Sequence, residues 1–154
     1  MHVGGERALR VLDLACGRGG GLDKYRRAAR DCAARLEFLV GVDVAAGAVD
    51  FARRRWNATV DNAKRFDSND KLSGGVVTAN LSATHAAHAI AEVDSKLAPG
   101  PDSIHVGACM FALHYFFDSE TSLMNLLSGA AWVLRQAGIF VAIHADGAAV
   151  VQAY

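Results

Sequence analysis

Asp13, Gly17 and Gly19 form the segment of this chain with the clearest chemical character. They lie in an Asp-x-x-x-Gly-x-Gly pattern at the end of an apolar run. Glycines in a turn between a strand and a helix let the backbone approach a ligand that side chains would exclude. Such turns serve NAD, FAD and phosphate sites, and some are only tight turns, but the spacing here is not G-x-G-x-x-G.

Asp43 is a second acid at the end of an apolar run, about 24 residues beyond Gly19. A carboxylate in this position can accept hydrogen bonds from both hydroxyls of a ribose. An Asp at a strand end can instead cap the helix that follows. Its occurrence together with Gly17 and Gly19 favours the ribose interpretation.

Phe111, His114 and Tyr115 follow a further apolar run at residues 104–109. The carboxyl ends of the strands are where an α/β sheet builds its ligand site. An aromatic ring there can position a purine base, and an imidazole can hydrogen-bond the edge of the base. The alternative interpretation of His114 and Tyr115 is a buried strand end with satisfied polar tips.

Apolar, β-rich runs alternate along the chain with longer alanine-rich segments of helical period, as is typical of βαβ units around a parallel sheet. Strands are expected at residues 10–16, 37–43, 75–80, 104–109 and 139–144. Helices are expected at residues 22–35, 47–62, 83–97, 119–135 and from 147 to the end, with loops at 57–74 and 98–102. Right-handed crossovers from a central first strand predict the order 3-2-1-4-5, with helices on both faces.

The composition indicates one domain with a real core, because 52% of the 154 residues are hydrophobic and 21% are charged. The net charge is zero, but thirteen Lys and Arg accompany eight Asp and Glu up to Phe66, and three accompany eight beyond it. A neutral total argues against sequence-blind binding of nucleic acid. Basic helix faces are usually solvated, yet a local basic wall could hold a few phosphates. Its members are Lys24, Arg26, Arg27, Arg30, Arg53, Arg54 and Arg55.

Other features exclude several classes of protein. No apolar stretch reaches membrane-spanning length, and the first residues form neither a signal core nor a transit peptide, so an intracellular protein is expected. Cys16, Cys32 and Cys109 form no C-x-x-C pair and are interpreted as reduced packing residues. His85 and His88 share a helical face, but without an apparent third ligand no metal site is expected.

The segments 11–20 and 109–117 together resemble the mRNA cap (guanine-N7) methyltransferases, and the likeness extends from residue 10 to about residue 151. The resemblance implies a Rossmann-like methyltransferase fold with S-adenosyl-L-methionine as cofactor. Asp13 would suit the cationic methionine end, Asp43 the ribose and Asn80 the adenine amino group, although a plain Asx turn is the alternative for Asn80. The implied cofactor-binding residues are Asp13, Ala15, Gly17, Arg18, Gly19, Asp43, Val44, Asn80, Leu81, Met110 and Phe111.

The same resemblance implies a capped mRNA 5′ end as the substrate. Lys24 and Arg55 match positions associated with the cap triphosphate, and His114 and Tyr115 match the guanine pocket. Guanine N7 carries a lone pair and no proton, so its methylation needs alignment and no general base, and no catalytic side chain is expected. The chain departs from the family pattern at Arg18, Gly21, Asn80 and Met110, where the family has Lys, Asp, Asp and Gln.

The whole chain, residues 1–154, is expected to be one partial methyltransferase domain, because family domains carry an N-terminal lid and further strands after the fifth. A fifth strand at an open edge exposes unpaired backbone groups, so another segment of the protein, a capping-enzyme partner or a self-copy is expected to cover it. The family implies the nucleus, or the cytoplasm for a viral or cytoplasmic capping system. A different S-adenosylmethionine-dependent methyltransferase, acting on a small molecule or another RNA, and a non-catalytic partner subunit remain as alternatives.

Overall fold

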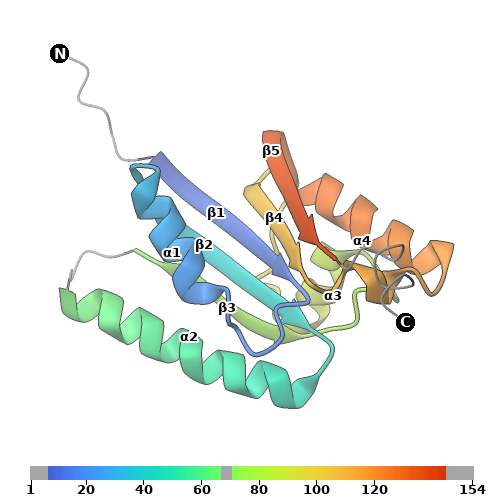
Figure 1. The fold of residues 1–154 in the computed structure, drawn as a ribbon, viewed down its shortest axis with the longest axis horizontal. Coiled ribbons are helices and arrows are strands. Elements are labelled where there is room, and N and C mark those ends of the chain that lie inside the picture. Colours follow the sequence, from blue (N-terminus) through green and yellow to red (C-terminus); the bar gives the residue numbers. More distant parts are fainter. Residues whose placement is uncertain (1–6, 67–70, 145–154) are drawn as a thin grey trace, which may run out of the picture.

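The computed structural model describes residues 7–66 and 71–144, which form a parallel sheet between two layers of helices (Figure 1). The strands are β1 (Arg7–Leu14), β2 (Ala34–Asp43), β3 (Ser73–Thr78), β4 (Ile104–Met110) and β5 (Leu134–Ile143). The helices are α1 (Leu22–Asp31), α2 (Ala46–Phe66), α3 (Ala86–Val93) and α4 (Glu120–Val133), with a 3₁₀ turn at Leu113–Phe116.

The strand order is β3-β2-β1-β4-β5, and all four pairings are parallel, so the predicted fold is confirmed. β1 therefore lies at the centre of the sheet. β2 and β3 are added on one side of it, and β4 and β5 on the other, so the strand order reverses between β1 and β4. In Figure 1, α1 and α2 lie on one side of the sheet and α3 and α4 on the other. A reversal of this kind opens a crevice at the carboxyl ends of the strands.

Both faces of the central strands β1 and β2 are buried, and their side chains alternate between the two faces. Leu12 and Val40 pack with residues of α3 and α4 in one hydrophobic cluster. Val11 and Leu39 pack in a second cluster that contains Trp56 of α2. The central strands are thus apolar on both sides, as expected where a parallel sheet is covered on both faces.

Several predicted boundaries differ from the structure. α2 continues to Phe66, so the first half of the loop predicted at 57–74 was wrong. The helix continues because Trp56, Thr59 and Ala63 form a buried stripe, whereas polar side chains cover its outer face. α3 is shorter than predicted, and β5 begins directly after α4. The helix predicted from residue 147 lies outside the described residues.

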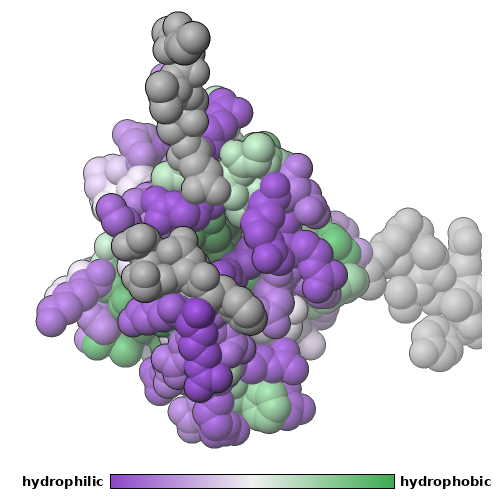
Figure 2. Space-filling model, turned by 90° about the vertical axis from the view of Figure 1, so that its left-hand side faces the viewer, coloured by the Kyte–Doolittle hydropathy of each residue, from purple (hydrophilic) through white to green (hydrophobic). Residues whose placement is uncertain are grey.

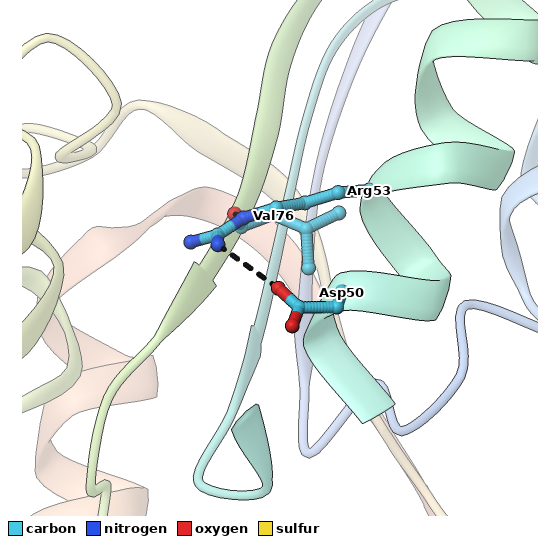
Figure 3. Close-up of polar contacts among 3 residues, drawn as sticks. All are labelled: Asp50, Arg53 and Val76. Carbon is cyan, nitrogen blue, oxygen red and sulfur yellow. Dashed lines mark hydrogen bonds and ion pairs between the residues drawn. The ribbon is translucent and has the colours of Figure 1, made fainter. Parts of the chain in front are cut away.

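Arg53 of α2 covers the open edge of the sheet at β3. Its Nε donates a hydrogen bond of 2.9 Å to the carbonyl oxygen of Val76, and its Nη1 lies 3.5 Å from the Asp50 carboxylate (Figure 3). Charged groups over an edge strand block pairing with another chain. Arg53 therefore has a structural role, although the sequence placed it in the basic wall.

The side of the molecule where β1 begins and α2 ends, at left in Figure 1, is mostly hydrophilic (Figure 2). Within the described ranges, no helix is long and apolar enough to cross a membrane. Among the large exposed apolar side chains, Phe111, Tyr115 and Phe117 follow the carboxyl end of β4, and others lie on α4 and β5. The aromatic ones after β4 lie at the edge where the strands end.

Gly74 is the glycine on which the pairing of β2 with β3 depends. It has φ of +127°, and a Cβ there would overlap the carbonyl oxygen of Leu39, its partner on β2. We expect Gly74→Ala to lower the free energy of unfolding by about 3 kcal/mol or more. Gly100→Ala is the control, because a Cβ at Gly100 meets only open space. Chemical denaturation of both variants measures the difference, and equal effects would contradict this role of Gly74.

Candidate functional site

Turns with unusual backbone conformations build the edge of the sheet where the strands end. Gly17 has φ of +53°, and a Cβ there would meet no atom within 4 Å. Ala15 and Phe111 also have positive φ, 59° and 60°, although neither is glycine. Such conformations are strained, and in proteins they cluster at functional sites. The two strained residues follow β1 and β4, the strands on either side of the reversal point.

Asp43 fixes the first of these turns. Its Oδ2 accepts a hydrogen bond of 2.8 Å from the backbone N–H of Gly17, and its Oδ1 accepts one of 2.9 Å from that of Ala45. The second bond is an Asx turn that reaches Ala45, the residue before α2, so Asp43 helps to set where the helix starts but is not its N-cap. Each carboxylate oxygen keeps further lone-pair capacity, so these backbone bonds leave room for a ligand hydroxyl.

The larger hollow at this edge has a volume of about 520 Å³ and opens between the turns after β1, β2, β3 and β4. Asp43 lines it beside Gly17, and Tyr115 lines it from the 3₁₀ turn. Most of its wall is apolar or backbone, with a few polar groups, as in binding sites for small molecules. The full lining is Ala15, Gly17, Asp43, Val44, Ala45, Ala79, Asn80, Leu81, Ser82, Met110, Phe111, Ala112, Tyr115 and Phe116.

Asn80 forms the Asx turn that the sequence left as an alternative. Its Oδ1 accepts a hydrogen bond of 3.0 Å from the N–H of Ser82. The carbonyl oxygen of Ser82 in turn accepts one of 2.7 Å from Nδ2 of Asn125 on α4. The loop is thereby held in place, and Asn80 lines the hollow, where its Oδ1 keeps a second lone pair that can accept from an adenine amino group.

A second hollow, of about 410 Å³, adjoins the first, and the two share Ala15, Met110 and Phe111 in their walls. Asp13 lies in this second hollow with Lys24. The other lining residues are Cys16, Gly20, Gly21, Tyr25 and Ala28. An acid and a base thus meet in one hollow, and an elongated ligand could extend from one hollow into the other.

Asp13 is the buried acid of the site, with 3% of its surface exposed. Burial raises its pKa to about 7, and the charge of Asp43 adds to this effect. The Tyr25 hydroxyl is close enough to lower the pKa, but its geometry is too poor for a full hydrogen bond. A cationic group in the second hollow would therefore favour ionisation of Asp13.

The aromatic residues after β4 form the exposed rim of the site. The rings of His114 and Tyr115 lie 4.1 Å apart at 45°, and Phe117 contacts His144 edge to face at 6.1 Å. Tyr115 is 71% exposed, so the alternative of a buried strand end is wrong for this residue. His114 is also exposed, but it does not line either hollow.

Some predicted cofactor residues are placed differently from the rest. The guanidinium of Arg18 stacks 4.0 Å from the ring centre of Phe51, and Arg18 lines neither hollow. Gly19 does not line either hollow. A Cβ at this position would lie 3.0 Å from the Cβ of Ala52, so the glycine allows the turn to pack on α2. Cofactor contact by these two residues stays a prediction.

Sequence reasoning missed Tyr25, whose ring forms part of the second hollow. Its position next to Lys24 in α1 was visible, but the period of the helix alone did not show that the ring faces Asp13. Lys24 lines the second hollow, and Arg55 lies near its rim, with Nη1 3.9 Å from the position of a Cβ on Gly20. Among the described residues there is no group of three or more metal-ligating side chains.

Comparisons with known proteins agree with this geometry. The family model described as the mRNA (guanine-N(7))-methyltransferase domain matches residues 2–154. The mRNA cap guanine-N(7) methyltransferase 1 of Arabidopsis thaliana is 28% identical over 92% of this chain, and that of Oryza sativa subsp. japonica is 30% identical over 92%. The chain spans 34% of the length of each of these relatives.

Solved structures share the fold at lower identity. An S-adenosylmethionine-dependent methyltransferase from Mesorhizobium loti superposes with a TM-score of 0.52 at 20% identity, covering 88% of this chain and 46% of its own. Geranyl diphosphate C-methyltransferase from Streptomyces coelicolor gives 0.53 at 18% identity, covering 91% and 41%. The fold is therefore the Rossmann-like fold of methyltransferases.

The raised pKa of Asp13 predicts how stability depends on pH. The carboxyl has an ordinary pKa of 3.8 and a folded pKa of about 7, so between these values the folded protein holds a proton that the unfolded chain releases. The free energy of unfolding should therefore fall as the pH rises from about 4 to 7, by at most about 4 kcal/mol, and stay low above 7. Denaturation across this range should show a smaller fall for Asp13→Asn, and unchanged pH dependence for Asp31→Asn, whose carboxylate is exposed. Parallel curves for the wild type and Asp13→Asn would contradict the assignment.

Proposed function

The chain belongs to the mRNA (guanine-N7)-methyltransferase family, whose model matches residues 2–154, and we propose that it transfers a methyl group from S-adenosyl-L-methionine to N7 of the cap guanine of mRNA. The observation that carries the proposal is the pair of adjoining hollows at the reversal point of the sheet, which share Ala15, Met110 and Phe111. One hollow contains a strand-end acid that can bind a ribose, and the other contains a buried acid that suits a cation.

The residues present fit this cofactor. The larger hollow can take the adenosine part, with the Asp43 carboxylate accepting from the ribose hydroxyls and Asn80 near the adenine. The open space at Gly17 allows close approach of the backbone. The second hollow can take the methionine part, whose positive charge would pair with Asp13.

The reaction requires positioning rather than proton transfer. The bound cofactor supplies a methyl group on a positively charged sulfur. The exposed rings of His114 and Tyr115 can hold the guanine, and Lys24 and Arg55 can hold the triphosphate that links it to the RNA. Alignment of acceptor and methyl carbon can supply roughly 7 to 11 kcal/mol of the barrier reduction, so no side chain needs to act as nucleophile or base.

The chain is a part of a larger methyltransferase in this proposal. We infer that residues 1–154 are one partial methyltransferase domain and that a further segment or a partner completes it, since the chain spans about a third of the relatives' length. Ile139, Val141 and Ile143 share one face of β5 and are exposed, and we infer that the further segment or partner covers this face. A nuclear location, or a cytoplasmic one for a cytoplasmic capping system, follows from the same family.

A two-step experiment tests the function. Calorimetry with S-adenosylhomocysteine should show binding, and failure to bind would favour a non-catalytic partner subunit. Methyl transfer should then occur on RNA with an unmethylated guanosine cap and not on the same RNA without a cap. Transfer to both RNAs alike, or only to a small molecule, would favour a different methyltransferase.

Asp43→Asn tests the ribose contact together with the two backbone bonds that the carboxylate accepts. The asparagine has one carbonyl oxygen in place of the two that accept from Gly17 and Ala45, so one of these N–H groups faces the amide NH2, and the charge that strengthens bonds to two hydroxyls is lost. We expect the affinity for S-adenosylhomocysteine to fall roughly tenfold to a hundredfold, with a modest fall in the thermal unfolding temperature. Calorimetry on the folded variant measures the loss. Unchanged affinity would leave Asp43 with the role of holding the two turns alone.

His114→Ala tests the guanine contact separately from the cofactor, because His114 is exposed and lines neither hollow. We expect methyl transfer to capped RNA to fall about a hundredfold, since a misplaced acceptor loses alignment, with little change in S-adenosylhomocysteine affinity. His88→Ala is the control, because His88 is exposed on α3 and pairs with Glu92. Equal rates for the two variants would make His114 a surface residue.

A further inference from the structure

A polar groove between α1 and α2 lies outside the two hollows of the site. It has a volume of about 560 Å³ and contains three of the seven basic residues of the predicted wall. Its lining residues are Asp23, Arg26, Arg30, Arg55, Ala58, Thr59 and Asn62. The two helices lie side by side on the same face of the sheet (Figure 1).

The helical period places these residues on facing walls. On α1, Asp23, Arg26 and Arg30 are three and four residues apart, so they share one face of the helix. On α2, Arg55, Thr59 and Asn62 do the same. The groove therefore has guanidinium groups on both walls, with hydroxyl and amide groups between them.

The contacts of the groove arginines hold two of them in place. Nη1 of Arg26 donates to the carbonyl oxygen of Thr59 at 3.4 Å, which tethers this side chain to the opposite wall. The guanidinium of Arg55 stacks over the Phe51 ring, 5.3 Å from its centre. Arg30 forms no ion pair with a described residue. Asp23 is the one acid in the lining, and its Oδ1 accepts a bond of 3.4 Å from the Thr59 hydroxyl. Three positive groups of the lining thus outnumber one negative group.

The groove continues the site. Arg55 lines the groove and also approaches Gly20, which lines the second hollow beside Lys24. From Lys24 to Arg30 the rise along α1 is about 9 Å. A chain of phosphates that passes Lys24 and Arg55 would therefore meet Arg30 next, and guanidinium forks bind phosphate oxygens in pairs.

We propose that this groove binds phosphates of the RNA chain that follows the cap, an inference that rests on the proposed function. Arg30 and Arg26 hold the backbone of the first nucleotides, while Lys24 and Arg55 hold the triphosphate. Since contacts to phosphates carry no sequence information, the groove would raise affinity for RNA over a cap dinucleotide without selecting a sequence.

The test compares three ligands in the presence of S-adenosylhomocysteine: a guanosine-capped short RNA, the same RNA without a cap, and the cap dinucleotide GpppG. Fluorescence anisotropy at several salt concentrations gives each dissociation constant. We expect Arg30→Ala to weaken binding of both RNAs about tenfold and to lower the salt slope by about 0.7, the value for one single-strand phosphate contact. GpppG binding should not change.

Arg27→Ala is the matched control, because Arg27 is an exposed arginine of the same helix that does not line the groove. Asp23→Asn should have the opposite effect and raise RNA affinity several-fold, since it removes the acid from the lining. Thermal unfolding of all three variants checks that they fold like the wild type.

Three results would overturn the proposal: equal losses for Arg30→Ala and Arg27→Ala, an equal loss for GpppG and RNA with Arg30→Ala, or no loss at all. A different result would separate it from the cap function. If the wild type neither binds nor methylates GpppG but Arg30→Ala still weakens uncapped RNA, the groove binds RNA and the cap assignment fails.

Discussion

Parallel pairing of β1 with both β2 and β4 is the interaction on which the site depends. In this register Asp13 pairs with Gly41 on one side and Ala108 on the other. All three strands therefore end at the same level, and the turns after them converge. The acid of β1, the acid that ends β2 and the strained Phe111 after β4 come together only because of this register. A shift of one residue would turn each of them to the opposite face of the sheet.

Placing an acid inside the sheet destabilises the protein, and the ligand would relieve that cost. Asp13 is almost fully buried, and its carboxyl has a pKa of about 7, so its ionisation at neutral pH is far less favourable than that of an exposed acid. Burial also raises the pKa of the neighbouring Cys16 thiol and Tyr25 phenol. The thiol and phenol beside Asp13 therefore stay uncharged at neutral pH, and a cation in the second hollow would favour the charged form of Asp13. Selectivity for a positively charged cofactor can arise from this arrangement, because a neutral ligand would not compensate the buried carboxylate.

The sequence was sufficient to predict the sheet, because its strands are continuous apolar runs and the strand order follows from handedness. It also located Asp13, Asp43 and Asn80, since residues at strand ends share one edge. Side-chain direction was not predictable. Arg53 and Arg55 are two positions apart on α2, yet one bonds to the edge of β3 and the other lies over the turn after β1. Arg18 likewise stacks on Phe51, a contact that depends on how α2 crosses the turn.

Gly21 shows how a departure from the family pattern can preserve a site. A Cβ at this position would lie 2.8 Å from the Tyr25 ring and 3.1 Å from Oδ2 of Asp13, so the aspartate that the family has here does not fit this backbone and ring position. A second carboxylate beside Asp13 would also raise the pKa of Asp13 further, because two like charges disfavour ionisation. Glycine at position 21 and the Tyr25 ring thus occupy complementary space. The departure follows from packing around the buried acid, and it leaves Asp13 as the acid of the second hollow.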